Sequence, residues 1–317
     1  MKRDVDASTL WFTAAELGNL MREYGDVAAQ GGGLDWGIAK LDKTMIPSRA
    51  GQLNFIIARP GNGKTTIAAI RAKRAAKRIM QHQTQDKECV VVISLDQAVE
   101  EVFPMMTANR KFTVSDLAWG RVPHEALVQH ALDSSPLPVR MIGKSVMRRS
   151  NTQMTFDQIF AAIDDIYKTH KVTPTHVMLD YIQIARTSNN PYKSKAEQVS
   201  EAVQRAADLS FAYGCTIDIC AQAGREVDKN AIKLPALSDC QWASAIEQEG
   251  YKVISVWRPV LTEGMGAKLK LFGNEFIVSQ DLLVMRLLKQ KMEAAGYTYI
   301  LKLDPASVEL FDWELQR

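Results

Sequence analysis

The residues with the most specific chemistry lie in one short stretch, "FIIARPGNGKTT", which runs from Phe55 to Thr66. An apolar run ends at a Pro/Gly turn and a helical pattern follows, so backbone N–H groups and the positive end of a helix face one point, as a phosphate requires. Lys64 can reach the β- and γ-phosphates of a nucleotide, and the Thr65 hydroxyl can ligate Mg²⁺. The spacing is that of a Walker A loop in which Ala58 replaces the usual first glycine. It predicts a nucleoside triphosphate site formed by Arg59, Gly61, Asn62, Gly63, Lys64, Thr65 and Thr66.

Three further polar residues end apolar runs that are typical of buried strands: Asp96 in "VVVISLD", Asp180 in "HVMLD" and Gln222 in "TIDICAQ". Ligands of such sheets gather at the carboxyl ends of the strands, so we expect these side chains near the phosphate loop. Asp180 fits the Walker B pattern, in which the acid holds Mg²⁺ through its water shell, although it could also simply cap a turn. Asp96 is a candidate general base for an attacking water, or a turn residue. Gln222 is a candidate sensor of the γ-phosphate.

The elements that must position these residues alternate along the chain. Continuous apolar strands at 53–57, 89–96, "THVMLDYIQIA" and "CTIDICAQ" are separated by helical segments, among them 65–80, "TFDQIFAAIDDIYKTH" and "KAEQVSEAVQRAADLSFAYG". This order predicts an α/β fold with a mostly parallel sheet and helices on both faces. "YKVISVW", "DLLVMRLLKQK" and "YTYILKLD" predict a strand-rich C-terminal edge. Residues 31–317 can form one domain.

Composition sets wider bounds. The chain has 317 residues, of which 46% are hydrophobic and 24% charged, and its net charge is +3, which neither demands nor excludes nucleic acid. Its four cysteines form no CxxC pair, so we expect neither a zinc site nor disulfides, but packing in a reducing cytosol. No apolar run approaches membrane-spanning length and acidic residues interrupt the N-terminus early, so we expect a cytoplasmic protein without a membrane anchor or a signal peptide.

Residues 1–30 form a separate N-terminal segment. Their apolar spacing predicts one amphipathic helix that starts at a cap-like Ser8 or Thr9, and Gly31-Gly32-Gly33 then breaks it as a linker. The apolar face of this helix must be buried, either on its own domain or on a neighbouring subunit. A second charged stretch, "RAKRAAKR" from Arg71 to Arg78, is interpreted as an exposed helix face, with a nucleic-acid contact as the lesser alternative.

With these segments in order, the chain resembles the C-terminal ATPase domain of DnaB-type replicative helicases of bacteria and phages, which has a RecA-like P-loop NTPase fold. The similarity extends over almost the whole chain. It is carried by "GGLDWGIAKLDKTM", "ARPGNGKTT", "VVVISLDQAVEEVFPMMTA", "VMLDYIQI", "CAQAGREVD", "LPALSDCQWASAIEQEGYKVISVWRP" and "LLKQKMEAAGYTYILKLD". Of these, the Ser-Asp followed by Ala-Ile-Glu-Gln is the most specific to the group.

The resemblance implies roles for these residues. Lys64, Thr65 and Asp180 would bind ATP–Mg²⁺, and Gln222 would read the γ-phosphate. Lys289 and Lys291 would reach the ATP of a neighbouring subunit.

The sequence also departs from the family in three ways. Asp96 stands where the family has a catalytic glutamate, and Lys291 stands where it has an arginine finger, which keeps the charge but loses the planar fork. We therefore expect ATP binding to be retained and hydrolysis to be slower than in the family. The family's N-terminal collar domain is expected to be absent, because only about thirty residues precede the core.

In this family single-stranded DNA passes through a hexameric ring and is held by loops that face the pore. The matching segments, "RTSNNPYKSKAEQ" and "GREVDKNAIK", are polar and locally basic, as backbone tracking requires. They predict DNA contacts from Arg186, Lys193, Lys195, Arg225 and Lys229.

The resemblance thus predicts an ATP-dependent ring helicase or translocase, an ATPase assembled as a homo-hexamer. Replication or mobile-element proteins are its possible partners. Residues 8–25 would pack on the adjacent protomer. The alternative is a RecA-like ATP-binding switch or scaffold of a phage, mobile element or defence system, with weak or no unwinding.

Overall fold

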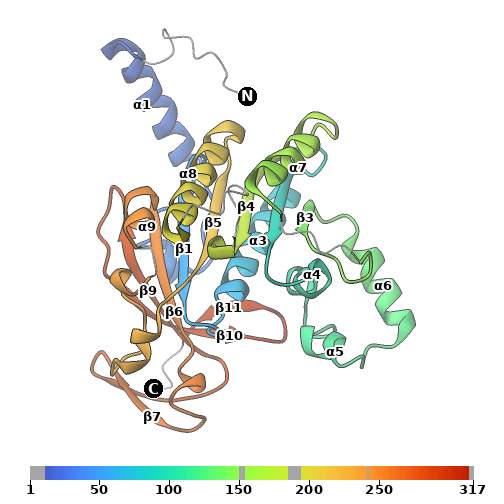
Figure 1. Ribbon diagram of the computed structural model, residues 1–317, viewed down its shortest axis with the longest axis vertical. Coiled ribbons are helices and arrows are strands. Elements are labelled where there is room, and N and C mark those ends of the chain that lie inside the picture. Colours follow the sequence, from blue (N-terminus) through green and yellow to red (C-terminus); the bar gives the residue numbers. More distant parts are fainter. Residues whose placement is uncertain (1–10, 150–153, 185–193, 241–242, 314–317) are drawn as a thin grey trace.

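The computed structural model describes residues 11–149, 154–184, 194–240 and 243–313. At its centre lies one sheet with the strand order β11-β10-β9-β6-β1-β5-β4-β2-β3 (Figure 1). The parallel strands are β1 Leu53–Ala58, β2 Glu88–Ser94, β3 Val139–Gly143, β4 Thr173–Asp180, β5 Thr216–Gln222 and β6 Lys252–Trp257. Antiparallel strands extend the sheet beyond β6: β9 Leu282–Gln290, β10 Thr298–Asp304 and β11 Glu309–Asp312. The predicted α/β fold, with its strand-rich C-terminal edge, is confirmed.

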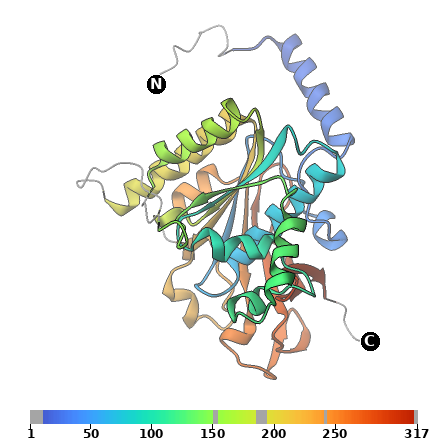
Figure 2. The same ribbon diagram turned by 90° about the vertical axis from the view of Figure 1, so that its right-hand side faces the viewer.

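Helices cover both faces of this sheet (Figure 2). On one face, α3 (Lys64–Gln81) and α4 (Val99–Thr107) bury Ile67, Ala72 and Val102 against the strands. On the other face, α7 (Phe156–Lys168) and α8 (Lys195–Tyr213) bury Ile159 and Val203, and α9 (Ala243–Glu249) packs beside them. Because both faces are covered, the central parallel strands are buried and mostly apolar, which is why they could be predicted from the sequence.

Several short elements were not predicted. They are α2 (Ala39–Asp42), α5 (Val114–Ala118), α6 (His124–Ser134), the edge strand β3 and the separate hairpin of β7 (Lys268–Leu271) and β8 (Asn274–Ile277). Among the side chains of α6 only Ser134 is buried, and in β3 only Ile142 is buried. Neither therefore carries the continuous apolar run by which the larger elements were predicted.

The N-terminal helix, α1, spans Ala14–Ala29, and its cap is Thr13 rather than Ser8 or Thr9. Thr13 Oγ1 accepts a hydrogen bond from the backbone N–H of Glu16 at 3.3 Å, and the Glu16 carboxylate accepts one from the backbone N–H of Thr13 at 2.7 Å. This reciprocal capping box is a stronger start signal than an isolated serine or threonine. The predicted caps lie outside the described residues. α1 buries none of its side chains and extends away from the sheet (Figures 1 and 2).

Within the described residues, no helix combines the length and the apolar character that crossing a membrane requires.

Candidate active site

The phosphate loop connects β1 to α3, and two glycines give it its shape. Gly61 has φ +76° and Gly63 has φ +90°, a region that side chains with a Cβ rarely adopt. Gly63 is also the N-cap of α3, and no side chain caps the helix there. The first N–H groups of α3 therefore keep their hydrogen-bonding capacity for an anion at the positive end of the helix.

The lysine and threonine of the loop meet the Walker B acid. Lys64 Nζ lies 3.4 Å from Asp180 Oδ1, and Thr65 Oγ1 donates a 2.6 Å hydrogen bond to Asp180 Oδ2. The Asp180 side chain is only 2% exposed, so its charge requires a partner, and Lys64 provides one. Thr66 follows in the first turn of α3 and is half-buried. One ammonium, one hydroxyl and one carboxylate thus converge beside the start of α3, which is the set that a magnesium–triphosphate requires.

Asp96 lies next to this group, just beyond the end of β2. Ser94 pairs with Asp180 across the two parallel strands, and the N–H of Leu95 donates to the Asp180 carbonyl at 2.8 Å. The Asp96 side chain is exposed. Burial and the charge of Asp96 raise the pKa of Tyr181, whose ring lies 4.7 Å from Lys64 Nζ. Asp96 is therefore close enough to influence the site while staying open to water, as a general base must be.

Gln222 ends β5 between the loop strand and the Walker B strand, and it pairs with Ala58 across β1. Its backbone carbonyl accepts a 3.3 Å hydrogen bond from Nε2 of Gln183, in the short 3₁₀ helix that follows β4. The Gln183 side chain is buried. Gln183, which lies three residues beyond the end of β4, was not predicted as a site residue.

Arg59 and Asn62 hold the loop in place instead of facing its centre. Arg59 donates to both carboxylate oxygens of Asp228, at 2.8 and 3.0 Å, and to the carbonyl of Ala223 at 3.0 Å. Asn62 is buried, and its Oδ1 accepts from the N–H of Arg258 at 2.9 Å. The nucleotide contact predicted for these two side chains remains a prediction. Arg258, which the sequence analysis missed, adds a half-buried guanidinium beside the loop, and burial lowers its pKa.

Lys289 and Lys291 lie at the other end of the sheet. Lys289 pairs with Val253, near the start of β6, whereas Ala58 at the phosphate loop pairs with Val256, farther along the same strand. Lys289 Nζ donates to the carbonyl of Glu247 in α9, and burial together with the charge of Lys291 lowers the pKa of Lys289. Lys291 is exposed. The structure therefore does not bring these lysines to their own chain's phosphate loop.

The predicted DNA-binding residues are only partly described. Arg186 and Lys193 lie outside the described residues. Lys195 begins α8 and is exposed, and Arg225 and Lys229 are exposed on the 3₁₀ helix that follows β5. Lys229 pairs at 2.6 Å with a glutamate one turn earlier. The described members thus follow the same strand ends that carry the site.

The fold and this loop define a P-loop nucleotide-binding protein of the RecA-like class. The family model described as "DnaB-like helicase C terminal domain" matches residues 33–286. The chain belongs to this family, which implies nucleotide binding.

Its relatives include the "Replicative DNA helicase DnaB" of Mycoplasma pneumoniae, 24% identical over 230 residues, which cover 71% of this chain and 46% of the relative. The "Replicative DNA helicase DnaC" of Bacillus subtilis is 22% identical over 250 residues, covering 78% and 51%. The chain therefore spans about half the length of the curated relatives it matches.

Two solved structures have the same fold. One, described as an "ATPase Domain", matches with a TM-score of 0.75 and 16% identity, covering 96% of this chain and 100% of that one. The other, a DnaB-like replicative helicase solved in a study of "its interactions with primase", matches with a TM-score of 0.72 and 17% identity, covering 93% and 66%.

Proposed function

We propose that this chain is the ATPase motor of a DnaB-like ring helicase, which hydrolyses ATP and moves along single-stranded DNA. The observation that carries the proposal is the convergence of Lys64, Thr65 and Asp180 at one edge of the sheet, in a chain that belongs to this family. Asp96 and Gln222 lie at neighbouring strand ends, where they can act on a bound γ-phosphate.

In this proposal Thr65 and Asp180 hold the magnesium ion, and Lys64 with the N–H groups of α3 holds the phosphates. The oxygen donors of Thr65 and Asp180 suit Mg²⁺, which is commonly bound by one or two protein oxygens together with substrate phosphates. When bound, the metal would neutralise charge that develops on the phosphate oxygens. Lys64 would then exchange its contact with Asp180 for one with a phosphate.

A second copy of the chain would complete the site. Lys289 and Lys291 lie toward the opposite end of β6 from their own loop, so in this proposal they act on the nucleotide of a neighbour, as the family resemblance implies. α1 exposes Leu17, Leu20 and Met21, which an adjacent protomer would cover. A matching surface is available on α5 and α6 and the turn between them, where Trp119, Leu127, Val128 and Leu132 are exposed. A closed hexameric ring repeats this contact at every interface.

DNA would lie beside the loops that follow β4 and β5. Lys195, Arg225 and Lys229 offer positive charge there, and Arg186 and Lys193 belong to the same proposal by sequence alone. Contacts of this kind follow the phosphate backbone and weaken steeply as salt concentration rises.

The first experiment measures ATP turnover with and without single-stranded DNA, for the wild-type chain and for Asp96→Glu and Lys291→Arg. DNA-stimulated turnover that rises in either variant supports a motor slowed by its two departures from the family. A forked DNA substrate then measures strand displacement. Turnover without displacement would contradict the helicase activity.

A switch or scaffold is the second candidate, and the two departures, Asp96 and Lys291, favour it. It predicts tight ATP binding with no turnover in all three proteins.

A further inference from the structure

Three arginines of α3 bind the segment that links α1 to the domain. They are Arg71, Arg74 and Arg78, here called the arginine ladder, and the segment is the hinge, residues 31–35. Successive members are three or four residues apart, so they lie along one side of the helix. This side was expected to be an exposed helix face. That expectation was wrong for Arg71, which is 3% exposed, and the other two are half-buried.

Arg71 and Arg74 hold the C-terminal half of the hinge. Arg71 Nη1 donates to the carbonyl of Asp35 at 2.8 Å and to that of Leu34 at 3.3 Å. Its Nε donates to the buried carboxylate of Asp218 at 3.0 Å, which fixes the guanidinium from behind. Arg74 Nε donates to the Asp35 carboxylate at 2.9 Å. The hinge is thus held by the arginines through its carbonyls and its one acidic side chain. A backbone bridge also holds it, in which the N–H groups of Leu34 and Ser48 donate to each other's carbonyls at 2.6 and 2.9 Å.

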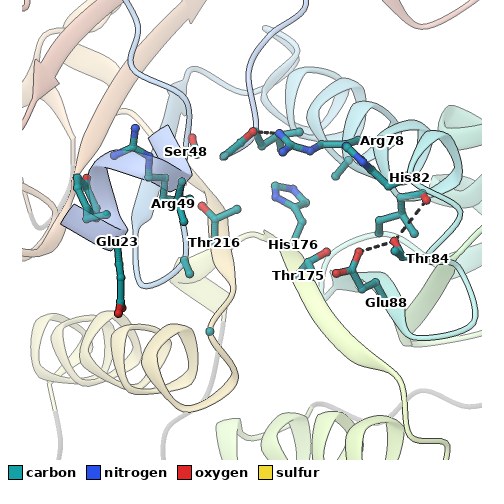
Figure 3. A pocket seen from close by; sticks show the side chains of 18 of the residues that line it. Glu23, Ser48, Arg49, Arg78, His82, Thr84, Glu88, Thr175, His176 and Thr216 are labelled. Carbon is teal, nitrogen blue, oxygen red and sulfur yellow. Dashed lines mark hydrogen bonds between the residues drawn. The ribbon is translucent and has the colours of Figure 1, made fainter. Parts of the chain in front are cut away.

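Arg78 holds the N-terminal half of the hinge. Its Nη2 donates to the carbonyl of Gly31 at 3.1 Å, and its Nη1 donates to the carbonyl of Gly33 (Figure 3). Gly33 itself fits closely, because a Cβ there would lie 2.9 Å from the carbonyl oxygen of Ser48. Every residue of the hinge except Gly32 therefore contributes a backbone carbonyl to the ladder.

Besides the hinge, α1 contacts the body through Tyr24, whose ring centroid lies 4.5 Å from the guanidinium carbon of Arg49. A cavity of about 780 Å³ separates the C-terminal half of the helix from the amino ends of β4 and β5 (Figure 3). It is lined by Leu20, Tyr24 and Val27 of α1 on one side and by His176 and Thr216 on the other. Since α1 buries no side chain, the hinge bonds and the contact between Tyr24 and Arg49 together set the direction in which α1 leaves the domain.

The ladder also connects two functional regions through one rigid element. α3 starts at Lys64, at the phosphate loop, and Arg78 lies near its other end. At 1.5 Å per residue the two are about 20 Å apart, with continuous helix between them. A shift of α3 at the phosphate loop therefore reaches the hinge without crossing a flexible segment.

We propose that the arginine ladder anchors the hinge to the phosphate-binding helix, and that it thereby sets the direction in which α1 reaches a neighbouring copy and makes that direction sensitive to bound nucleotide. The anchoring is independent of the proposed function. The nucleotide sensitivity and the contact with a neighbour rest on it.

The test compares the wild-type chain with the double variant Arg74→Gln/Arg78→Gln. Arg71 is left intact because it is buried and paired. The matched control is Lys77→Gln, which removes a charge from the same helix but points away from the hinge, to Glu309 at 3.3 Å. Amide hydrogen exchange is followed in peptides that cover residues 31–35, in the full chain at concentrations too low for assembly.

Without nucleotide, the hinge amides of the double variant should exchange about tenfold faster or more than those of the wild type. The loss of one charge-assisted hydrogen bond is enough to change the opening equilibrium of the hinge by that factor. Lys77→Gln should match the wild type. Equal exchange in the double variant and the wild type would overturn the anchoring.

A non-hydrolysable ATP analogue with Mg²⁺ is the second probe. The analogue should slow amide exchange at the hinge in the wild type and in Lys77→Gln, but not in the double variant. The affinity for the analogue should stay within about twofold in all three proteins, because no ladder residue faces the phosphate loop. If the bound analogue leaves the exchange rate of the wild-type hinge unchanged, the proposed nucleotide sensitivity is wrong. If the analogue does not bind the wild type at all, the proposed function fails, and the anchoring is still decided by the comparison without nucleotide.

Sedimentation at higher concentration then measures self-association, which should be weaker by about tenfold or more in the double variant. Unchanged association in the double variant would contradict the claim about the direction of α1. A wild type that does not associate at any concentration would contradict the ring.

Discussion

The two ends of the sheet differ in how complete they are. At the carboxyl end, Lys64, Thr65 and Asp180 come from α3 and β4 and already contact one another within one chain. Toward the amino end, Lys291 is exposed and α1 buries none of its side chains. One end assembles its groups within one chain, whereas the other presents groups with no ligand of their own chain nearby. In the proposed ring, each chain would offer most of one site and a small part of another.

The interior near the two ends also differs. At the carboxyl end, the buried acid Asp180 is balanced by a lysine that must be free to move. Toward the amino end, Asp218 is fixed by Arg71 at 3.0 Å and by Asn54 at 2.8 Å. Burial would raise the pKa of Asp218, but Arg71 and then His176 outweigh it, and the pKa lies below its usual value. Several hydrogen bonds and an ion pair fix Asp218 in this way, which supports structure, whereas a single exchangeable contact suits catalysis.

Among the substitutions considered, replacing Lys64 at the carboxyl end should change ATP turnover the most. Lys64→Ala removes the cation that faces the phosphates, so ATP turnover should fall by roughly 10²–10³-fold, as when one preorganised donor is lost from an active site. Steady-state ATPase assays measure the change. Lys77→Gln, on the same helix, should keep wild-type turnover. Near-normal turnover in Lys64→Ala would place the chemistry elsewhere.

Mixing two impaired variants tests whether Lys291 acts on the nucleotide bound by a neighbouring copy. Lys291→Ala should lower turnover by at least about tenfold, less than the loss of a full arginine finger, and leave nucleotide affinity unchanged. Mixing Lys64→Ala with Lys291→Ala should restore part of the activity, because some interfaces then pair an intact loop with an intact lysine. A mixture no more active than its components would show that Lys291 does not act across an interface.

A buried lysine near the amino end of the sheet should make the free energy of unfolding depend on pH. Burial, and then the charge of Arg71, lowers the pKa of Lys252 to about 7. Between pH 7 and pH 9 the unfolded chain therefore holds a proton that the folded chain has lost, so the free energy of unfolding should gain about 2 kcal/mol from this residue as pH rises. Urea denaturation at both pH values measures the gain. Lys252→Met should lose it, and the exposed control Lys43→Met should not.

The smallest effect is expected at the cap of α1. Thr13→Ala removes a capping side chain and should destabilise the helix by about 1 kcal/mol. Circular dichroism should show slightly less helix, while the melting temperature of the domain stays unchanged because α1 buries none of its side chains. A lower domain melting temperature would mean that α1 packs on its own sheet.

The sequence was sufficient to predict the central strands of the sheet and the residues that meet at their carboxyl ends. Strands buried on both faces are mostly apolar, so polar residues at their ends, such as Asp180 and Gln222, are easily recognised. The tertiary partners could not be predicted. Arg71 is buried because Asp218, 147 residues away, and the hinge carbonyls surround it, and no local pattern encodes that. In the same way, Arg59 lies in the phosphate loop but bonds Asp228, which lies in the 3₁₀ helix that follows β5.

The order of the strands in the sheet also affects how the chain folds while it is being synthesised. β1, which carries the phosphate loop, lies between β5 and β6, and Asn54 on β1 bonds Thr216, 162 residues further on. At typical rates of translation, roughly 10–30 s separate the appearance of these two strands. Throughout that interval the first strand has no neighbours in the sheet, and contacts between segments so far apart are slow to form. The nucleotide site is therefore among the first motifs to be made and among the last to be assembled, which exposes the apolar strand β1 to aggregation in the meantime.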